Sequence, residues 1–266
     1  MKSKNIIEFK NIYVNYGINF SALKNVNLQI CNNENWAILG ANGCGKSTLI
    51  KLISNDLYPN TKYPFSKKIF GEDNWNIFEL KKKLGIITND LHNYYSNQGK
   101  YSTAYDVILS GFQSSIQIYD YQVYSKGEHE KVMEVMDFLE ISHIKDKKVS
   151  EMSTGQLRKC IIGRALIHNP KAFILDEPTV GLDIKAQCNF INLIRKLSKK
   201  SSIILVTHHI EEIFPEITHV ALVYKNTIYK QGKKDDILNS ENLSEIFEFD
   251  IELKKENDKY YIKSLF

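Results

Sequence analysis

Residues 40–48 read GANGCGKST, and this stretch decides the fold class. It directly follows the apolar run WAIL at 36–39, and from Lys46 onward apolar residues recur on one side of a helix. The spacing fits G-x-x-x-x-G-K-[ST], which forms a phosphate-binding loop between a strand and a helix. Three glycines let the backbone curl so that successive N–H groups can point at phosphate oxygens: Gly40, Gly43 and Gly45. The stretch therefore predicts an α/β fold that binds phosphate groups.

The other residues of this loop carry its side-chain chemistry. Lys46 is expected to reach the β and γ phosphates of a nucleotide, and the Ser47 hydroxyl is expected to ligate Mg²⁺. The remaining positions are expected to line the nucleotide: Ala41, Asn42, Cys44 and Thr48. The amide dipoles of the loop could lower the pKa of Cys44, but a small residue that simply fits the loop is the favoured interpretation.

Two acids follow a second apolar run, AFIL at 172–175. Taken alone, Asp176 and Glu177 would more often form a solvated turn. Beside a phosphate loop they favour a catalytic site, because Asp176 can hold Mg²⁺ through water and Glu177 can orient or deprotonate an attacking water.

Four motifs stand in a fixed order along the chain: GANGCGKST (40–48), MSTGQ (152–156), ILDEPTVGLD (174–183) and VTHH (206–209). Together they resemble the nucleotide-binding domain of an ATP-binding cassette (ABC) protein over roughly residues 5–235. The resemblance implies an ATPase with ATP and Mg²⁺ as cofactors, in which Lys46, Glu177 and His208 are catalytic. His208 matches the histidine that contacts the γ-phosphate.

In this family two domains pair head to tail around two ATP molecules. The resemblance implies that Ser153, Gly155 and Gln156 contact the ATP held by the partner's phosphate loop, with Asp183 in the segment that crosses the seam. Anion binding at a helix N-terminus explains that chemistry. The family usually reads Leu-Ser-Gly-Gly-Gln, whereas this chain has Met152 and Thr154. Without the resemblance, residues 151–160 fit an N-capping turn equally well.

Two further family positions carry over. Tyr16 matches the aromatic residue that stacks on adenine. Asn89 stands after LGIIT (84–88), where the family usually has a glutamine that helps bind Mg²⁺ or water and couples the site to a transport partner. Asparagine has the same amide but one methylene less reach, which puts the coupling in doubt. His209 with Glu211 and Glu212 does not have H-E-x-x-H spacing, so no second metal site is expected.

The pattern along the chain predicts the architecture. Strands that alternate with helices favour a mainly parallel sheet. The expected fold is an α/β P-loop NTPase with an N-terminal antiparallel β part, an inserted α-helical subdomain at about 89–165 and a C-terminal hairpin. The nucleotide-binding domain is expected at 1–235, and a helix with a β-hairpin at 236–266. Residues 90–106 are predicted to be a long polar connection, with Ser102 or Thr103 as the cap of the next helix.

The composition limits the partners. The net charge is +4 and only three residues are arginine, which does not favour specific DNA recognition, so no nucleic-acid partner is expected. The four scattered cysteines favour a reduced, intracellular chain. There is neither a secretory signal nor an apolar run of membrane-spanning length, so any membrane role must come through a partner.

These observations lead to one function hypothesis and one alternative. The first is a cytoplasmic ATP-hydrolysing subunit of an ABC transporter, peripheral on the inner face of the membrane. It would form a homodimer around two Mg-ATP and drive separately encoded transmembrane permease subunits. The alternative is a soluble ABC-type ATPase that acts as a conformational switch or assembly factor. The transported substrate and the direction of transport are not readable from this chain.

Overall fold

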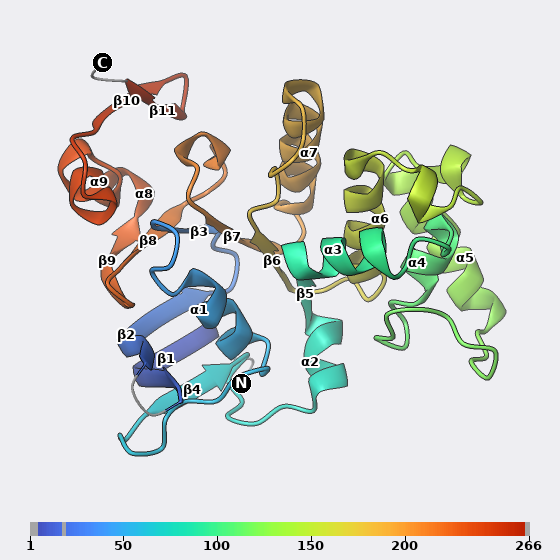
Figure 1. Cartoon of the computed structure of the whole chain (residues 1–266), viewed down its shortest axis with the longest axis horizontal. Coiled ribbons are helices and arrows are strands. Elements are labelled where there is room, and N and C mark those ends of the chain that lie inside the picture. Colours follow the sequence, from blue (N-terminus) through green and yellow to red (C-terminus); the bar gives the residue numbers. More distant parts are fainter. Residues whose placement is uncertain (1–4, 18–19, 264–266) are drawn as a thin grey trace. The chain divides into compact units, whose positions relative to one another are not determined.

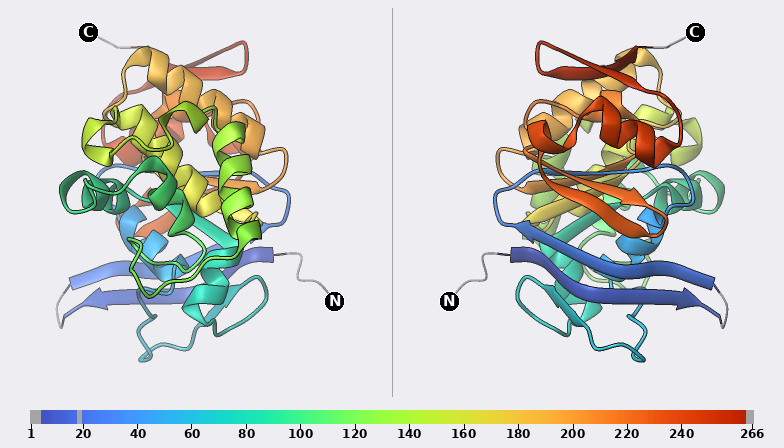
Figure 2. Two further views of the ribbon diagram at one scale, coloured as in Figure 1. Left: turned by 90° about the vertical axis from the view of Figure 1, so that its right-hand side faces the viewer. Right: turned by 90° about the vertical axis from the view of Figure 1, so that its left-hand side faces the viewer.

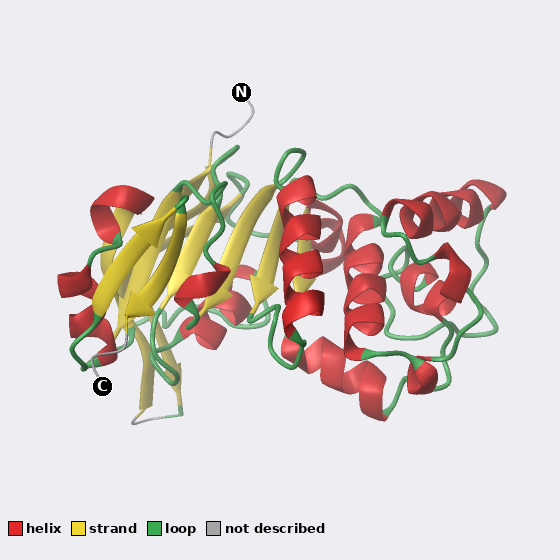
Figure 3. Ribbon diagram, turned by 90° about the horizontal axis from the view of Figure 1, so that it is seen from above, coloured by secondary structure: helices red, strands yellow, loops and turns green. Residues whose placement is uncertain are grey.

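The structure is a computed structural model that describes residues 5–17 and 20–263. The chain divides into two compact units, Met1–Ile77 with Leu197–Phe266 and Phe78–Lys196. The first unit is rich in strands and the second is mainly helical, as Figure 3 shows by colour.

The first unit contains an antiparallel sheet built on two long strands, β1 (Asn5–Tyr16) and β2 (Phe20–Cys31), which run side by side in Figure 2. The short strand β4 (Ser66–Ile69) pairs with the other edge of β1. Apolar residues of β1 are buried at Ile7, Phe9, Ile12 and Val14, and register shifts in the pairing explain why their alternation is imperfect. The predicted N-terminal antiparallel part is confirmed, and β4 is an addition.

The same unit holds four strands of the core sheet, in the order β7-β3-β8-β9 (Figure 1). β3 (Trp36–Leu39) runs parallel to both β7 (Ser202–Thr207) and β8 (His219–Tyr224), and β9 (Thr227–Lys233) is antiparallel to β8. Every residue of β3 and β7 is buried, which is why these strands read as unbroken apolar runs in the sequence.

The C-terminal part of the first unit forms two short helices and a hairpin: α8 (Lys234–Ile237), α9 (Ser240–Phe247), β10 (Glu252–Glu256) and β11 (Lys259–Lys263). Asn257 and Asp258 have φ values of 49° and 58°, which suits the two central residues of a tight hairpin turn. Asp235 anchors the hairpin by accepting hydrogen bonds of 2.8 Å from Lys255 and from the Tyr260 hydroxyl. The predicted hairpin is confirmed as far as Lys263, and its last predicted residues lie outside the described part.

The second unit combines two parallel strands with a set of helices. β5 (Leu84–Ile87) pairs with β6 (Ala172–Asp176). The helices of this part of the chain are α2 (Ile77–Lys83), α3 (Asn89–Asn97), α4 (Ala104–Leu109), α5 (Lys126–Phe138), α6 (Thr154–Leu166) and α7 (Ile184–Leu197). The parallel pairs β3–β7, β3–β8 and β5–β6 confirm the mainly parallel α/β core.

One expectation about the second unit was wrong. Residues 90–106 are not all connection, because α3 occupies Asn89–Asn97 with Thr88 as its cap. This helix is polar, and it is anchored by Tyr95, which is fully buried with its hydroxyl 3.2 Å from that of Ser110. A single anchoring side chain leaves no apolar periodicity to read.

The caps of the other helices follow a common pattern. Thr103, Ser125 and Ser153 each cap a helix through a reciprocal capping box with an acidic or amide residue three positions later. Thr103 is therefore the cap of α4, which decides between the two predicted candidates. Among the described helices, none combines the length and the apolar character that crossing a bilayer requires.

Candidate active site

The phosphate loop lies between β3 and α1 (Lys46–Ile53), in the first unit. Gly43 and Gly45 have φ values of 80° and 108°, a backbone region that residues with a side chain rarely adopt. A Cβ on Gly40 would lie 2.4 Å from the Val223 carbonyl oxygen, and one on Gly45 would lie 2.9 Å from the Leu23 side chain. The loop therefore needs glycine for its curvature and for its close packing on the two sheets.

Lys46 is held in the loop by its own backbone. Its side chain is buried, and Nζ donates to the carbonyl oxygens of Gly40 at 2.8 Å and Ala41 at 3.0 Å. The ammonium group is thus fixed against the curled backbone, at the N-terminus of α1, where the helix dipole also favours an anion. This combination of a buried cation and a helix N-terminus fits a phosphate group.

Other predicted loop residues surround this point. Ser47 is exposed in the first turn of α1, and Asn42 is exposed in the loop. Thr48 is buried, with its hydroxyl 3.5 Å from that of Tyr16 at the end of β1. Tyr16 is 42% exposed, so part of this residue is accessible next to the loop.

Cys44 is a buried member of the loop. Burial raises the pKa of its thiol, although the positive charge of Lys46 acts in the opposite direction. The thiol is therefore neutral at ordinary pH, and the alternative of an activated thiolate does not hold.

His208 lies close to the loop because of strand register. β3 and β7 are parallel neighbours and Leu39 pairs with Thr207, so Gly40 and His208 each follow a paired residue at the same carboxyl edge of the sheet. Ligands of open α/β sheets bind at that edge. The half-buried ring of His208 contacts the ring of His209, with 4.0 Å between the centroids.

The MSTGQ segment (152–156) begins α6 in the second unit. Ser153 is exposed and caps the helix, and the Gln156 side-chain oxygen accepts hydrogen bonds from the Ser153 N–H at 3.1 Å and from Lys147 Nζ at 3.2 Å. The Gln156 oxygen therefore has a capping role within the chain. A direct contact of Gln156 with nucleotide stays a prediction.

Gly155 has no steric reason to be glycine within the chain. A Cβ at this position would meet only ordinary contacts, 3.8 Å from Ala186 and 3.9 Å from Leu182. The space in front of the α6 N-terminus is therefore open at Gly155, beside the exposed Ser153 hydroxyl.

The two acids and Asn89 also lie at one sheet edge, in the second unit. Ile87 pairs with Leu175, so the residues that follow β5 and β6 leave the sheet at the same end. On one side Asn89 comes after β5, and on the other Asp176 is the last residue of β6 and Glu177 follows it. Glu177 has a left-handed φ of 45°, which an L-residue adopts only when its surroundings hold it there.

Asp183 directly precedes the next helix, α7. Its carboxylate accepts a hydrogen bond from the Ala186 N–H at 2.8 Å and so caps α7. Its position is thus fixed by the chain itself, whereas any contact with a second molecule stays a prediction.

Sequence reasoning missed Arg158. This residue is buried on α6, and its guanidinium donates to the carbonyl oxygens of Pro178 at 2.6 Å and Val180 at 2.5 Å. It also lies 3.5 Å from the side-chain oxygen of Asn89. The one feature of the sequence that could have pointed to this residue is its type, because arginine is rare in this lysine-rich chain.

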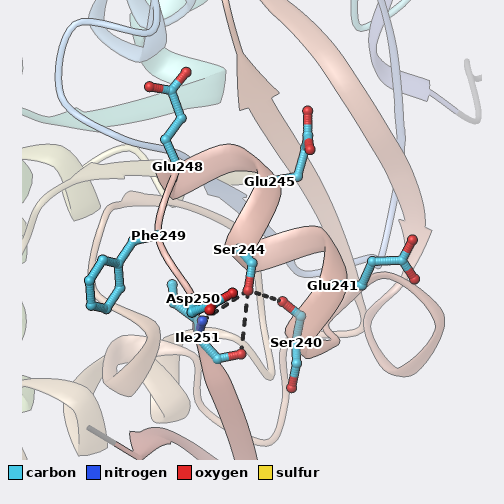
Figure 4. Close-up of a pocket in the computed structure, with 8 residues that line it drawn as sticks. All are labelled: Ser240, Glu241, Ser244, Glu245, Glu248, Phe249, Asp250 and Ile251. Carbon is cyan, nitrogen blue, oxygen red and sulfur yellow. Dashed lines mark hydrogen bonds between the residues drawn. The ribbon is translucent and has the colours of Figure 1, made fainter. Parts of the chain in front are cut away.

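A hollow of about 660 Å³ near α9 contains no predicted site residue. Its lining is drawn in Figure 4, where the Ser244 hydroxyl is the centre of the hydrogen bonds. Ser244 donates to the Ser240 carbonyl at 2.8 Å and accepts from the Ile251 N–H at 2.9 Å, so these polar groups serve to join α9 to the following segment.

Comparison with known proteins identifies the family to which the chain belongs. A family model described as ABC transporter matches residues 23–180, more than half of the chain. The chain is 28% identical over 251 residues to the uncharacterized ABC transporter ATP-binding protein YlmA of Bacillus subtilis (strain 168), with 90% of each chain covered. It is 31% identical over 252 residues to the energy-coupling factor transporter ATP-binding protein EcfA1 of Staphylococcus aureus (strain USA300), covering 92% of this chain and 89% of that one.

Solved structures of ABC transporter proteins also resemble this chain in fold. cbiO1 from Clostridium perfringens, described as part of the ABC transporter complex cbiONQ, has a TM-score of 0.73 at 26% identity, with 92% of each chain covered. The dimeric structure of MJ0796, a bacterial ABC transporter cassette, has a TM-score of 0.69 at 25% identity, covering 85% of this chain and 98% of that one. The motifs, the fold and these likenesses together show that the chain belongs to the ABC transporter family, as an ATP-binding subunit with ATPase activity.

Proposed function

We propose that two copies of this chain pair around two Mg-ATP and that ATP hydrolysis in the pair drives separately encoded membrane subunits. In each site one copy contributes its phosphate loop and the other contributes Ser153 and Gly155. The observation that carries the proposal is the open N-terminus of α6, where an exposed Ser153 stands beside a glycine that the chain's own packing does not require.

The physical reason is that a helix N-terminus attracts anions. Its first N–H groups have no partner within the helix, and the helix dipole adds a partial positive charge. A methyl group at position 155, in the first turn of the helix, would narrow the space beside these donors, so glycine suits a site that a phosphate approaches from outside. The solved dimer of the related cassette MJ0796 supports a second copy as the source of that phosphate.

Within each site the residues divide the work. Lys46 and the loop amides would bind the phosphates, and the partly exposed Tyr16 would stack on the base. Glu177 would take a proton from the attacking water, with His208 in contact with the γ-phosphate. Bound Mg²⁺, held by Ser47, Asp176 and the predicted third ligand Asn89, would neutralise charge on the phosphate oxygens.

The membrane partner is inferred from relatives. EcfA1 is named as an energy-coupling factor transporter ATP-binding protein, and cbiO1 is described as part of the ABC transporter complex cbiONQ. This chain would work in the cytoplasm, peripherally at the inner face of the membrane, with residues 1–235 as the nucleotide-binding domain and 236–266 as an extension. ATP binding would close the pair and hydrolysis would reopen it, a two-state motion that a partner can use.

The dilution dependence of turnover tests the pairing. We expect the ATPase rate per chain to fall when the protein is diluted, and Glu177→Gln to bind ATP without turnover and to accumulate as a dimer. A monomer that hydrolyses ATP at full rate at every concentration would contradict the shared site.

A separate experiment tests the membrane role. Tagged protein is purified from membranes and the chains that travel with it are identified. An integral membrane chain in the complex is the expected result. A complex that contains only soluble chains would instead favour the switch or assembly factor.

A further inference from the structure

One buried guanidinium in the second unit joins three segments that carry predicted site residues. Arg158 lies in the second turn of α6, and only 4% of it is exposed. Nη1 donates to the Pro178 carbonyl at 2.6 Å, and Nη2 donates to the Val180 carbonyl at 2.5 Å. The same Nη2 lies 3.5 Å from Oδ1 of Asn89, the first residue of α3.

The two carbonyls belong to the turn that connects Glu177 to Asp183. This turn is closed by hydrogen bonds from the Val180 N–H to the Glu177 carbonyl at 3.3 Å and from the Leu182 N–H to the Thr179 carbonyl at 3.1 Å. The left-handed backbone of Glu177 needs support from its surroundings. The guanidinium holds the residues directly after Glu177 and so supplies such support.

Arginine suits this place and lysine does not. A guanidinium is a rigid planar fork with five donors, whereas a lysine ammonium is a compact point charge on a flexible stem. Only the fork can hold two carbonyls and an amide oxygen in a fixed arrangement. Removing it would leave the buried Pro178 carbonyl and the partly buried Val180 carbonyl without this donor, and native structures avoid such a loss at buried groups.

A second residue of α3, His92, is also influenced by this guanidinium. His92 lies one turn after Asn89, and its Nε2 is buried without a hydrogen-bond partner among the described residues. Burial, and then the positive charge of Arg158, lower the pKa of His92. His92 is therefore neutral at neutral pH and adds no like charge near Arg158. The α3 acceptor that reaches the guanidinium is the Asn89 side chain.

We propose that Arg158 is a positioning residue of the ATPase reaction: it clamps the Glu177–Asp183 turn to α6 and uses Asn89 as its third acceptor. A displacement of the MSTGQ segment at the start of α6 would thereby reach the turn that holds Glu177. The proposal rests on the proposed function, because it takes Glu177 as the base and Ser153 as a contact to the partner's ATP. It gives Asn89 a role that differs from that of a metal ligand.

The test compares two conservative substitutions on the same helix. Arg158→Lys breaks the clamp, and Arg164→Lys is the matched control, because Arg164 also donates to a backbone carbonyl, that of Ser115 at 2.8 Å. The full-length variants are measured for kcat, KM, ATP affinity and hydrogen exchange at the Val180 and Leu182 amides. Arg158→Lys is expected to lose about 10- to 100-fold in kcat with KM and ATP affinity little changed, because the reacting groups are misplaced.

Exchange at the two amides should be faster in Arg158→Lys and unchanged in Arg164→Lys. If the two variants have the same kcat and the same exchange, the clamp is ruled out. If Arg158→Lys does not fold, the variant Asn89→Ala is used as the test in its place. It removes one acceptor of the guanidinium at a half-buried site. It should lower kcat and speed exchange at Val180, and unchanged exchange would overturn the proposal.

The role of Asn89 is separated from metal binding by a double variant. If Asn89 serves Arg158, adding Asn89→Ala to Arg158→Lys changes kcat little further, and Asn89→Ala leaves the Mg²⁺ concentration for half-maximal turnover unchanged. Additive losses together with a raised Mg²⁺ requirement would show a metal ligand instead. Failure of the proposed function looks different: if Glu177→Gln keeps full turnover, the assignment of the base is wrong, while the difference in exchange between the two arginine variants still reports the clamp.

Discussion

The Ser153 hydroxyl accepts a hydrogen bond from the Gln156 N–H at 3.2 Å, and the Gln156 side chain accepts one from the Ser153 N–H at 3.1 Å. This reciprocal pair fixes the start of α6. It leaves the N–H groups of Thr154 and Gly155, the first two residues of the helix, available to an external anion. The helix N-terminus is thus prepared by the chain for a ligand that approaches from outside.

Gly155→Ala should separate activity from stability. The fold accepts a Cβ at this position, and alanine in a helix is favoured over glycine by up to about 1 kcal/mol, so the melting temperature should hold or rise. The methyl group would obstruct the phosphate, and turnover should fall by at least about tenfold.

The matched control is Gly127→Ala, measured by the same thermal melts and ATPase assays. Gly127 is the second residue of α5, behind the capping box of Ser125, and a Cβ there meets nothing within 4 Å. It should keep full activity. Equal activity in the two alanine variants would mean that no phosphate approaches Gly155.

Lys46→Ala should abolish tight nucleotide binding. The ammonium is fixed within the loop by two backbone carbonyls, and hydrogen bonds to charged groups contribute about 1.5–3 kcal/mol each, so the ATP dissociation constant should rise by about 10- to 100-fold or more. Calorimetric titration with ATP measures this change. Lys51→Ala, which removes an exposed lysine of the same helix, should bind ATP as the unaltered chain does; unchanged affinity in Lys46→Ala would contradict the phosphate-loop assignment.

The cysteines should react with a thiol reagent in a defined order. Cys188 is exposed and should be labelled first, whereas Cys160 is buried and burial raises the pKa of its thiol to about 12. Cys44 is also buried with a raised pKa and should stay unlabelled in the folded chain. Mass spectrometry of labelled peptides at neutral pH measures the order, and Cys188→Ser should remove the fast phase. Fast labelling of Cys44 would mean that the loop opens.

Lys67 should make stability depend on pH in the alkaline range. Burial lowers the pKa of this lysine to about 8 in the folded chain, partly offset by the charge of Asp56, while an unfolded lysine titrates near 10.4. Between these values the unfolded chain binds more protons than the folded chain, so this group's contribution to stability rises with pH.

Urea unfolding of the unaltered chain and of Lys67→Met from about pH 7 to about pH 10.5 measures the effect. The unaltered chain should gain stability relative to Lys67→Met across this window. The neighbouring Lys68, which pairs with Asp73 at 4.0 Å, supplies the control variant Lys68→Met. A difference that stays constant with pH would contradict the lowered pKa.

Much of the fold could be read from local pattern. β3 and β7 are buried on both faces and therefore appear as continuous apolar runs, and α5 shows its buried stripe at Val132, Val135 and Met136. α3 could not be read in this way, because one buried tyrosine anchors an otherwise polar helix. β4 has only four residues, of sequence SKKI, too short to show a period.

The chemistry of this protein was decided by its sequence: the spacing of glycines, lysine and serine in the phosphate loop, and the order of the motifs after it. Such spacing is a local property, because neighbouring residues set the curvature of a loop and the start of a helix. Tertiary structure alone decided that burial keeps the Cys44 thiol neutral. It alone brought Arg158 to the turn after Glu177. Burial and contacts between distant segments depend on how the chain packs, and no local pattern of residues records them.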